Sequence, residues 1–448
     1  MGTTVLSSVI LIGGFFLLMA FKVPITFAMF ISTCLSALTF GTPLTAMCRM
    51  MLAGVNNFTM LAIPFFIVMG EIMAEGKISD KIVDVANLAV GRFRGGLAYV
   101  NCLDSMFFGG ISGSAVADVS SLGSVVIPMM VDQGYDDEFA VGLTVTTSCQ
   151  GVLIPPSHNM VIFALAYGGG VSIGDLFYAG IVPGIALGVG FMVLCFFMGK
   201  KYNFPKGDKM FADHPHRWSI YKGDDGKRHM GPALKTVVDA ILPMLTLVII
   251  LVGTGAGVFT ATESSAVACF YTFILTYFIF RTARIRDFGQ VLKRSLKTLA
   301  IVLTLIATAK AFAYMMTNLR IPAAITGAII GLTSNPIILI FLIMLILLIL
   351  GCFMDMAPLI MIMTPILKPV AESIGMSAIH FGIVIIFTLA IGLCTPPVGS
   401  ALFVGCAVGH TNLEKTSKKM LPLFFTMVVV LLLVAYVPFL AKWGLFGY

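Results

Sequence analysis

The chain has 448 residues, of which 58% are hydrophobic and 11% charged, and its formal net charge is +7. Soluble domains carry about 25% charged residues, so this composition excludes a soluble globular protein and indicates a polytopic membrane protein. Most basic residues lie in short loops, which argues against a nucleic-acid-binding surface. The nine cysteines are scattered singly without a Cys-x-x-Cys pair, so neither a disulfide framework nor a zinc site is expected.

Ten apolar runs approach the roughly 20 residues that a helix needs to cross a bilayer, and two further apolar stretches differ from them. The stretches 96–131 and 336–371 each have a polar or Gly/Pro-rich kink near the middle and are too short for two full crossings. We therefore predict a re-entrant hairpin at each. The predicted spans are 4–21, 24–40, 57–75, 138–168, 176–199, 236–252, 258–280, 299–317, 378–409 and 421–440.

The positions of the basic residues predict the orientation of these spans. Cytoplasmic loops are enriched in Lys and Arg, and all but five of the 28 basic residues fall in the cytoplasmic segments when the N-terminus is placed outside. We therefore predict that both termini lie outside, whereas the polar linker 200–235 and an amphipathic surface helix at 281–297 lie inside. Residues 1–199 and 236–448 then form two repeats with opposite orientations.

Each half of the chain carries two interruptions of its apolar sequence. In the first half they are residues 109–118, Gly-Gly-Ile-Ser-Gly-Ser-Ala-Val-Ala-Asp, and residues 151–157, Gly-Val-Leu-Ile-Pro-Pro-Ser. In the second half they are residues 351–358, Gly-Cys-Phe-Met-Asp-Met-Ala-Pro, and residues 392–399, Gly-Leu-Cys-Thr-Pro-Pro-Val-Gly. The second Pro-Pro pair lies 241 residues after the first.

These paired interruptions predict both a fold and a site. Unpaired backbone groups in hydrocarbon cost several kcal/mol each, so broken helices in corresponding places of two halves point to the binding site of a transporter. The predicted fold class is an all-α polytopic membrane protein with two inverted repeats. Each repeat has about five spans, one of them broken, and a re-entrant hairpin.

Polar side chains in these segments are candidates for ion or substrate binding. Ser112 and Ser114 bring hydroxyl oxygens, the ligand type that Na⁺ prefers, to the first hairpin. The alternative is that such small residues only allow close helix packing. Asp118 and Asp355 lie in the two hairpins, where a carboxylate either has a function or caps a half-helix. Lys310 lies within a span, either near an anionic substrate or snorkelling to the interface.

Six segments along the chain form a specific combination of motifs. They are residues 61–70 (Leu-Ala-Ile-Pro-Phe-Phe-Ile-Val-Met-Gly), 109–114, 154–157, 171–177 (Val-Ser-Ile-Gly-Asp-Leu-Phe), 179–184 (Ala-Gly-Ile-Val-Pro-Gly) and 257–268 (Gly-Val-Phe-Thr-Ala-Thr-Glu-Ser-Ser-Ala-Val-Ala). With these motifs the chain resembles one family over essentially its whole length, the large membrane subunit of tripartite ATP-independent periplasmic (TRAP) transporters. His158, Asn159 and Met160 depart from the commonest form of the family, which leaves the substrate open.

The resemblance implies a sodium-driven, elevator-type importer in the bacterial inner membrane, with periplasmic termini, no organic cofactor and no enzymatic activity. In such a system a periplasmic binding protein delivers an organic acid: a dicarboxylate, a keto acid or a sugar acid such as sialic acid. A small four-helix membrane subunit braces the large one, and we expect it as a separate chain. The implied sodium-binding residues are Ser112, Ser114, Gly151, Pro155, Met354, Gly392 and Thr395, and the expected substrate-binding residues are Asp118, Ser157, Asp355, Pro397 and Gly399.

Two alternatives remain at this stage. A sodium/carboxylate symporter of related fold would work without a binding protein. An intramembrane serine protease is suggested by residues 110–113, which fit the Gly-x-Ser-Gly pattern around a rhomboid-type nucleophile, with His158, His380 and His410 as candidate bases. The protease interpretation does not explain the repeated breaks, and it requires a Ser–His pair within hydrogen-bond reach.

Overall fold

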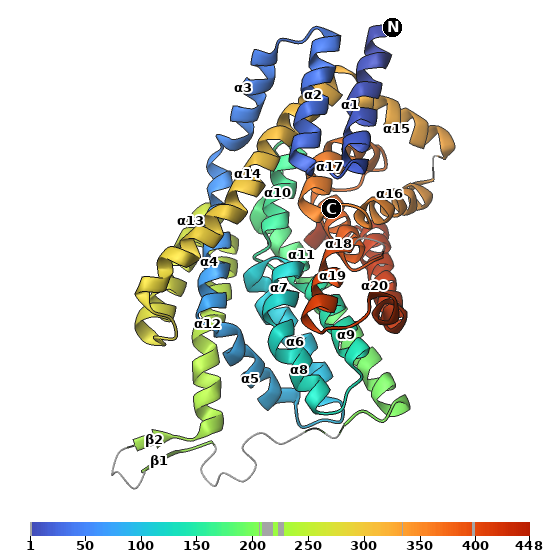
Figure 1. Cartoon of the computed structure of the whole chain (residues 1–448). Helices are drawn as coiled ribbons and strands as arrows, with labels where there is room; N and C mark the ends of the chain where they lie inside the picture. Colours follow the sequence, from blue (N-terminus) through green and yellow to red (C-terminus); the bar gives the residue numbers. More distant parts are fainter. Residues whose placement is uncertain (1, 206, 208–217, 223–227, 334, 397–398) are drawn as a thin grey trace.

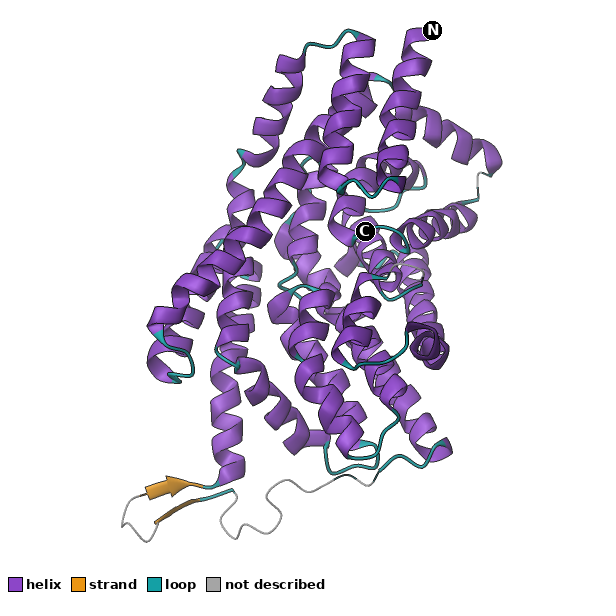
Figure 2. Cartoon of the chain, in the orientation of Figure 1, coloured by secondary structure: helices purple, strands orange, loops and turns teal. Residues whose placement is uncertain are grey.

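The computed structural model describes residues 2–205, 207, 218–222, 228–333, 335–396 and 399–448. This part of the chain is almost entirely helical (Figure 2). Seven of its helices are long and apolar enough to cross a membrane, or up to eight if a bent pair counts as one span. The predicted all-α polytopic fold is therefore confirmed.

The first half begins with a pair of packed helices and ends with a long helix that leads into the linker (Figure 1). Its elements are α1 (Gly2–Ala20), α2 (Ile25–Phe40), α3 (Leu44–Val55), η1 (Phe58–Leu61), α4 (Ala62–Glu75), α5 (Ile78–Val90), α6 (Gly96–Ser112), α7 (Ala115–Ser121), α8 (Gly123–Asp132), α9 (Asp137–Leu153), α10 (His158–Tyr167) and α11 (Ile173–Lys201).

The linker contains a short antiparallel hairpin of β1 (Ile220–Lys222) and β2 (Arg228–Met230), a small exception to the all-helical expectation. The second half follows it. Its elements are α12 (Pro232–Gly255), α13 (Ala261–Ile274), η2 (Leu275–Ile279), η3 (Ile285–Asp287), α14 (Phe288–Asn318), α15 (Ile321–Leu332), α16 (Pro336–Gly351), α17 (Met356–Ser373), α18 (Ala378–Leu393), α19 (Ser400–Val408), α20 (Leu413–Ala441) and η4 (Gly444–Phe446).

The two halves contain the same series of elements. A helical hairpin (α6–α8 or α16–α17) is followed by a broken helix (α9–α10 or α18–α19) and then by a long helix (α11 or α20). The first hairpin starts beside the linker, where the N–H of Gly95 donates a 3.0 Å hydrogen bond to the carbonyl oxygen of Pro205. The second hairpin starts after α15, toward the end of the molecule that holds the N-terminus (Figure 1).

All α-helices except α1, α5 and α15 fall into two groups. We call α2–α4 with α12–α14 the frame group, because α14 packs against α2, α3 and α4, and α13 packs against α4. We call α6–α11 with α16–α20 the hairpin group, in which each hairpin packs against the broken helix of its own half and α9 packs against α18 and α20. Figure 1 shows the frame group largely to the left of the hairpin group.

The boundaries of some elements differ from the prediction. The prediction of a separate surface helix at 281–297 is wrong, because η3 and the continuous 31-residue helix α14 occupy that region. No proline occurs between Phe288 and Asn318, and the only glycine is Gly289, so nothing in the sequence ends the helix. Helices α3, α5 and α15 were not predicted, because their 12, 13 and 12 residues are too short to cross a bilayer.

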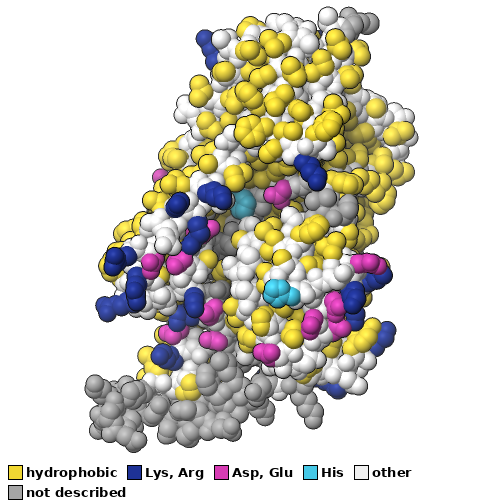
Figure 3. All heavy atoms as spheres, viewed as in Figure 1, with side chains coloured by type: hydrophobic (Ala, Val, Ile, Leu, Met, Phe, Trp, Pro, Cys, Tyr) yellow, Lys and Arg dark blue, Asp and Glu magenta, His cyan; other side chains and the backbone are white. Residues whose placement is uncertain are grey.

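The surface is that of a membrane protein. Large apolar side chains on α1, α2 and the turn between them are exposed, including Val5, Phe27 and Leu38 at 63%, 60% and 60%. Figure 3 shows apolar side chains over the upper part of this face, whereas Lys, Arg, Asp and Glu side chains gather over the lower part. Such a distribution buries apolar surface in lipid and leaves charge at the end that carries the linker.

Candidate ion and substrate site

The first hairpin meets the first broken helix at a pair of glycines. Gly109 lies near the end of α6, and Gly151 lies near the end of α9. A Cβ atom added to either glycine would lie 2.3 Å from the Cα atom of the other, far inside the optimal separation of about 3.5–4.0 Å between carbon atoms. The two glycines therefore set how closely the hairpin approaches the broken helix.

The turn of the first hairpin lies against the break between α9 and α10. Gly113 has a φ of +63°, and a Cβ atom on it would lie 2.9 Å from the carbonyl oxygen of Pro156. The side-chain nitrogen of Asn159 donates a 3.4 Å hydrogen bond to the carbonyl oxygen of Gly113. Ser114 is the N-cap of α7, and its hydroxyl accepts a hydrogen bond from the N–H of Ala117. The structure thus places Ser114 beside the first Pro-Pro break.

The second hairpin repeats the glycine contact. Gly351 is the last residue of α16, and Gly392 lies one residue before the end of α18. A Cβ atom on Gly351 would lie 3.2 Å from the Cα atom of Gly392, and one on Gly392 would lie 2.7 Å from the Cα atom of Gly351. These glycines follow Gly109 and Gly151 by 242 and 241 residues, so both halves make the same contact in corresponding places.

Other predicted residues of the second half lie around this contact. Met354 is buried. Asp355 occupies the N-cap position of α17, but its side chain makes no capping hydrogen bond to that helix. The hydroxyl of Thr395 donates a 2.7 Å hydrogen bond to a carbonyl oxygen one turn earlier. Gly399 directly precedes α19. Pro397 lies outside the described residues.

The two breaks converge inside the hairpin group. The Sγ atoms of Cys149 in α9 and Cys394 directly after α18 are 3.0 Å apart. The halves also interlock, because α10 packs against α17 and α19 packs against α7. In the first of these contacts the Nζ of Lys368 donates a 3.1 Å hydrogen bond to the carbonyl oxygen of Tyr167. The structure therefore brings the described segments around both breaks into one region, and the roles of their individual residues stay predictions.

A buried carboxylate lies beside the first glycine contact. Asp118 is 1% exposed, and a Cβ atom on Gly109 would lie 3.5 Å from its Oδ2. Neither carboxylate oxygen has a hydrogen-bond partner among the side chains that the structure describes, and the same holds for the buried hydroxyl of Ser157. A buried charge is unfavourable unless it is paired or binds a cation. Asp118 is therefore either protonated or neutralised by a group from outside the chain, such as a bound cation.

The remaining predicted residues have simpler placements. Gly151 and Pro155 are buried on the two sides of the end of α9. The backbone of Ser112 ends α6, but its side chain lies outside the part of the chain that the structure describes.

Sequence reasoning missed several residues of this region. Gly109 and Gly351 each begin an interrupted motif, and their spacing of 242 residues was an available signal for an equivalent role. Asn159 was noted only as a departure from the commonest form of the family, and its hydrogen bond to a backbone carbonyl of the hairpin turn has no signal in the sequence. Asp104 in α6 is fully buried, and neither of its oxygens has a hydrogen-bond partner among the described side chains.

Helical hairpins and broken helices that meet inside an all-helical membrane fold are the architecture of a secondary transporter. A family model described as "Tripartite ATP-independent periplasmic transporter, DctM component" matches residues 12–440. The chain belongs to this family of transporter permeases, as its motifs indicated. It is therefore not an enzyme, which excludes the protease alternative.

Individual relatives agree with this assignment. The chain is 34% identical over 419 residues to the sialic acid TRAP transporter large permease protein SiaM of Vibrio cholerae, with 93% of each chain covered. It is 36% identical over 383 residues to the C4-dicarboxylate TRAP transporter large permease protein DctM of Pseudomonas aeruginosa, covering 86% of this chain and 85% of that protein. The solved structure of the YdaH transporter of Alcanivorax borkumensis has a similar fold, with a TM-score of 0.61, 13% identity and 88% of each chain covered.

Proposed function

We propose that this permease imports an organic acid together with sodium across the bacterial inner membrane. A periplasmic binding protein delivers the acid, and a separate small four-helix membrane subunit supports the frame group. The proposal draws on relatives named for sialic acid and for C4-dicarboxylates, both of which carry carboxylates. Both termini then lie in the periplasm and the linker lies in the cytoplasm, in accord with the distribution of basic residues.

The observation that carries this proposal is the repeated glycine contact. Gly109 with Gly151 and Gly351 with Gly392 place each hairpin against the broken helix of its own half. A repeated hairpin and broken helix are the elements with which secondary transporters form a site at the middle of the membrane. We infer that the hairpin group moves as a unit against the frame group, in the manner of an elevator.

The ends of the broken helices suggest how ion and substrate share this region. The carboxyl ends of α9 and α18 offer carbonyl oxygens to sodium near Gly151, Pro155, Gly392 and Thr395. The amino ends of α10 and α19 offer free N–H groups and partial positive charge to a substrate carboxylate. The side chain of Asp118 repels a substrate carboxylate, so we assign it to the charge balance of sodium. Ser157 and Gly399 then lie at the substrate side.

The sodium dependence of uptake tests the role of Ser114. Replacing an N-cap serine by glycine destabilises a helix by only a few tenths of a kcal/mol, whereas alanine costs about 1 kcal/mol. If Ser114 is a sodium ligand, both Ser114→Gly and Ser114→Ala raise the sodium concentration for half-maximal uptake by at least about tenfold, because both remove the hydroxyl oxygen. The measurement is uptake by proteoliposomes that hold the permease, its small subunit and its binding protein.

The same experiment separates a ligand from a helix cap. A residue that only caps α7 would lower protein abundance in Ser114→Ala, leave it nearly normal in Ser114→Gly, and leave the sodium response of both variants unchanged. Uptake by the unchanged protein that is independent of sodium would contradict the proposed function itself.

A further inference from the structure

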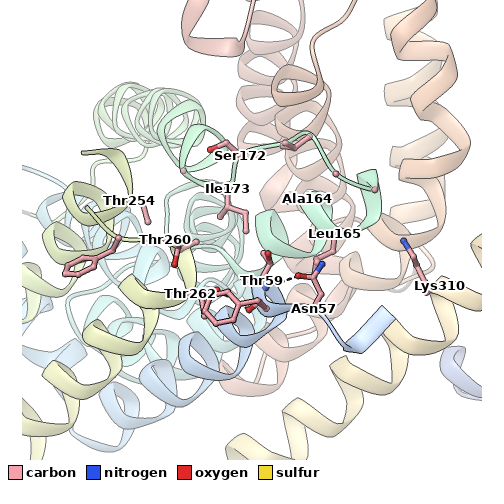
Figure 4. A pocket seen from close by; sticks show the side chains of 17 residues that line it. Asn57, Thr59, Ala164, Leu165, Ser172, Ile173, Thr254, Thr260, Thr262 and Lys310 are labelled. Atoms are coloured by element: carbon pink, nitrogen blue, oxygen red, sulfur yellow. Dashed lines mark hydrogen bonds between the residues drawn. The ribbon is translucent and has the colours of Figure 1, made fainter. Parts of the chain in front are cut away.

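A polar cavity lies between the two groups of helices, away from the hairpin turns. Its volume is about 460 Å³, and Figure 4 shows side chains from η1, α10, α11, α12, α13 and α14 around it. None of the residues predicted for the ion and substrate site lines it. We call it the Lys310 cavity, and its polar lining consists chiefly of Asn57, Thr59, Ser172, Thr260, Thr262 and Lys310.

Lys310 is the only charged residue in the lining of this cavity among the described residues. It lies on α14, deep within a predicted span, and it has no ion pair in the described part of the chain. Its stem lies over Gly54 of α3, where an added Cβ atom would lie 2.9 Å from the Cβ atom of Lys310. Lys310 is half-buried, and it therefore brings a cation to the cavity that no acidic side chain pairs with in the described part of the chain.

The neighbouring polar groups present hydrogen-bond donors. The Oδ1 of Asn57 already accepts a 3.0 Å hydrogen bond from the N–H of Thr59, which leaves the two protons on its nitrogen to donate. Figure 4 shows this nitrogen directed toward the side on which Lys310 lies. Ser172 likewise accepts a 3.2 Å hydrogen bond from the N–H of Asp175, so its hydroxyl proton remains available.

Backbone N–H groups add further hydrogen-bond donors to the cavity. The cavity is lined by Ile173 and Gly174 at the start of α11, and by Ala261 and Thr262 at the start of α13. The first N–H groups of a helix lack partners within it and carry partial positive charge. Each of these two helices also carries one acidic residue in its first turn that lies outside the lining. These are Asp175 in α11 and Glu263 in α13, and Glu263 accepts hydrogen bonds of 2.8 Å and 2.9 Å from the N–H and hydroxyl of Thr260.

We propose that the Lys310 cavity is an anion-binding site that receives the carboxylate of the organic acid before the acid reaches the hairpin turns. This inference rests on the proposed function for the identity of the anion. Helix α10 connects the two places: His158 begins it beside the Pro-Pro break, and its other end lines the cavity. The 10 residues of α10 separate them by about 15 Å at 1.5 Å per residue.

The position of Lys310 gives the cavity a role in transport. Lys310 belongs to the frame group, whereas the segment from α10 to α11 belongs to the hairpin group. An anion bound here therefore contacts both groups at once. Movement of one group past the other changes the distance between Lys310 and the α10–α11 segment, so the acid leaves the cavity as the hairpin group moves.

Chemical labelling of Lys310 tests the site without requiring transport. The full-length permease in lipid nanodiscs is treated with acetic anhydride, and acetylation of Lys310 is followed by mass spectrometry, with the exposed Lys415 as internal reference. Succinate and N-acetylneuraminate are the probes, and neutral 1,4-butanediol is the control. We expect at least one acid to slow acetylation of Lys310 about tenfold at saturation, because an ion-paired ammonium group is a poor nucleophile, with no effect on Lys415. Equal rates with and without both acids would overturn the proposal.

Substitutions give a second measurement. A hydrogen bond to a charged group contributes about 1.5–3 kcal/mol, which corresponds to roughly a ten- to hundredfold change in affinity. Lys310→Met should therefore raise the acid concentration for half-maximal uptake by at least tenfold, and Lys310→Arg by only a few-fold. Arg320→Gln, which changes an exposed cation beyond the end of α14, should have no effect.

The two experiments distinguish the cavity from the transport function. Protection of Lys310 in a protein whose uptake ignores sodium would support the anion site and contradict sodium coupling. Normal half-saturation in Lys310→Met, with uptake still driven by sodium, would overturn the anion site and leave the proposed function intact.

Discussion

Replacing Gly151 by alanine is expected to abolish sodium-dependent uptake, because the new methyl group would lie 2.3 Å from the Cα atom of Gly109. The backbone of α6 or α9 must then shift, and overpacking of this kind costs about 1–3 kcal/mol. A shift at this contact separates the first hairpin from the first break. The measurement is uptake by proteoliposomes, normalised to the amount of folded permease.

The second half offers a graded version of this test. Gly392→Ala should impair uptake more than Gly351→Ala. The new Cβ atom would lie 2.7 Å from the Cα atom of Gly351 in the first variant, and 3.2 Å from the Cα atom of Gly392 in the second. Gly327→Ala in α15 is the matched control, because nothing lies within 4 Å of its added Cβ atom and alanine favours the helix. More than half of normal uptake by Gly151→Ala would show that the glycine contact does not organise the site.

Replacing Asp118 by asparagine is expected to reduce uptake at physiological sodium at least about tenfold. The carboxylate is buried, and neither oxygen has a hydrogen-bond partner among the described side chains. If sodium balances its charge, the neutral amide of nearly equal size weakens sodium binding, by about 1.5–3 kcal/mol for a charge-assisted contact. The expected signature is a raised half-saturation for sodium, with maximal uptake partly restored at high sodium.

The control for Asp118 lies in the same hairpin. Asp132 is exposed at the end of α8, so Asp132→Asn removes a carboxylate from the hairpin without changing its buried part. The two variants should differ in sodium response at equal abundance. If Asp118→Asn keeps the sodium response of the unchanged protein, Asp118 has no part in sodium binding.

Much of the fold was predictable because membrane helices leave a strong signal in the sequence. The hairpins and breaks were recognised from Gly, Ser and Pro within apolar runs. Irregular backbone occurs at membrane depth only where protein buries it or where it lines a water-filled cavity. Short helices such as α3 and α15 leave no comparable signal, because 12 residues cannot cross the bilayer. The prediction placed a surface helix at 281–297 and a separate span at 299–317, because basic residues are concentrated in the first of these segments. The structure has the single helix α14 there, since no residue between the two segments breaks a helix.

The site was predictable in part. Equivalent motifs indicated which segments would meet, and the contact of Gly109 with Gly151 has its counterpart at Gly351 and Gly392. The Lys310 cavity was not predictable, because its lining comes from six separate elements of both halves whose approach depends on tertiary packing. Sequence spacing places Lys310 in a span, but only the fold shows that Asn57 and the amino ends of α11 and α13 surround the same space.

The central claim is that sodium and the organic acid bind to one coupled site, and binding isotherms at different sodium concentrations test it most directly. Titrations of the acid would use the purified permease with its small subunit, between about 1 and 100 mM sodium with choline as the replacement cation. Coupling free energies are typically 1–3 kcal/mol, so the account predicts that Kd for the acid falls about tenfold or more as sodium rises. By linkage, the affinity for sodium rises when the acid is present. A Kd that is the same at all sodium concentrations would contradict the account.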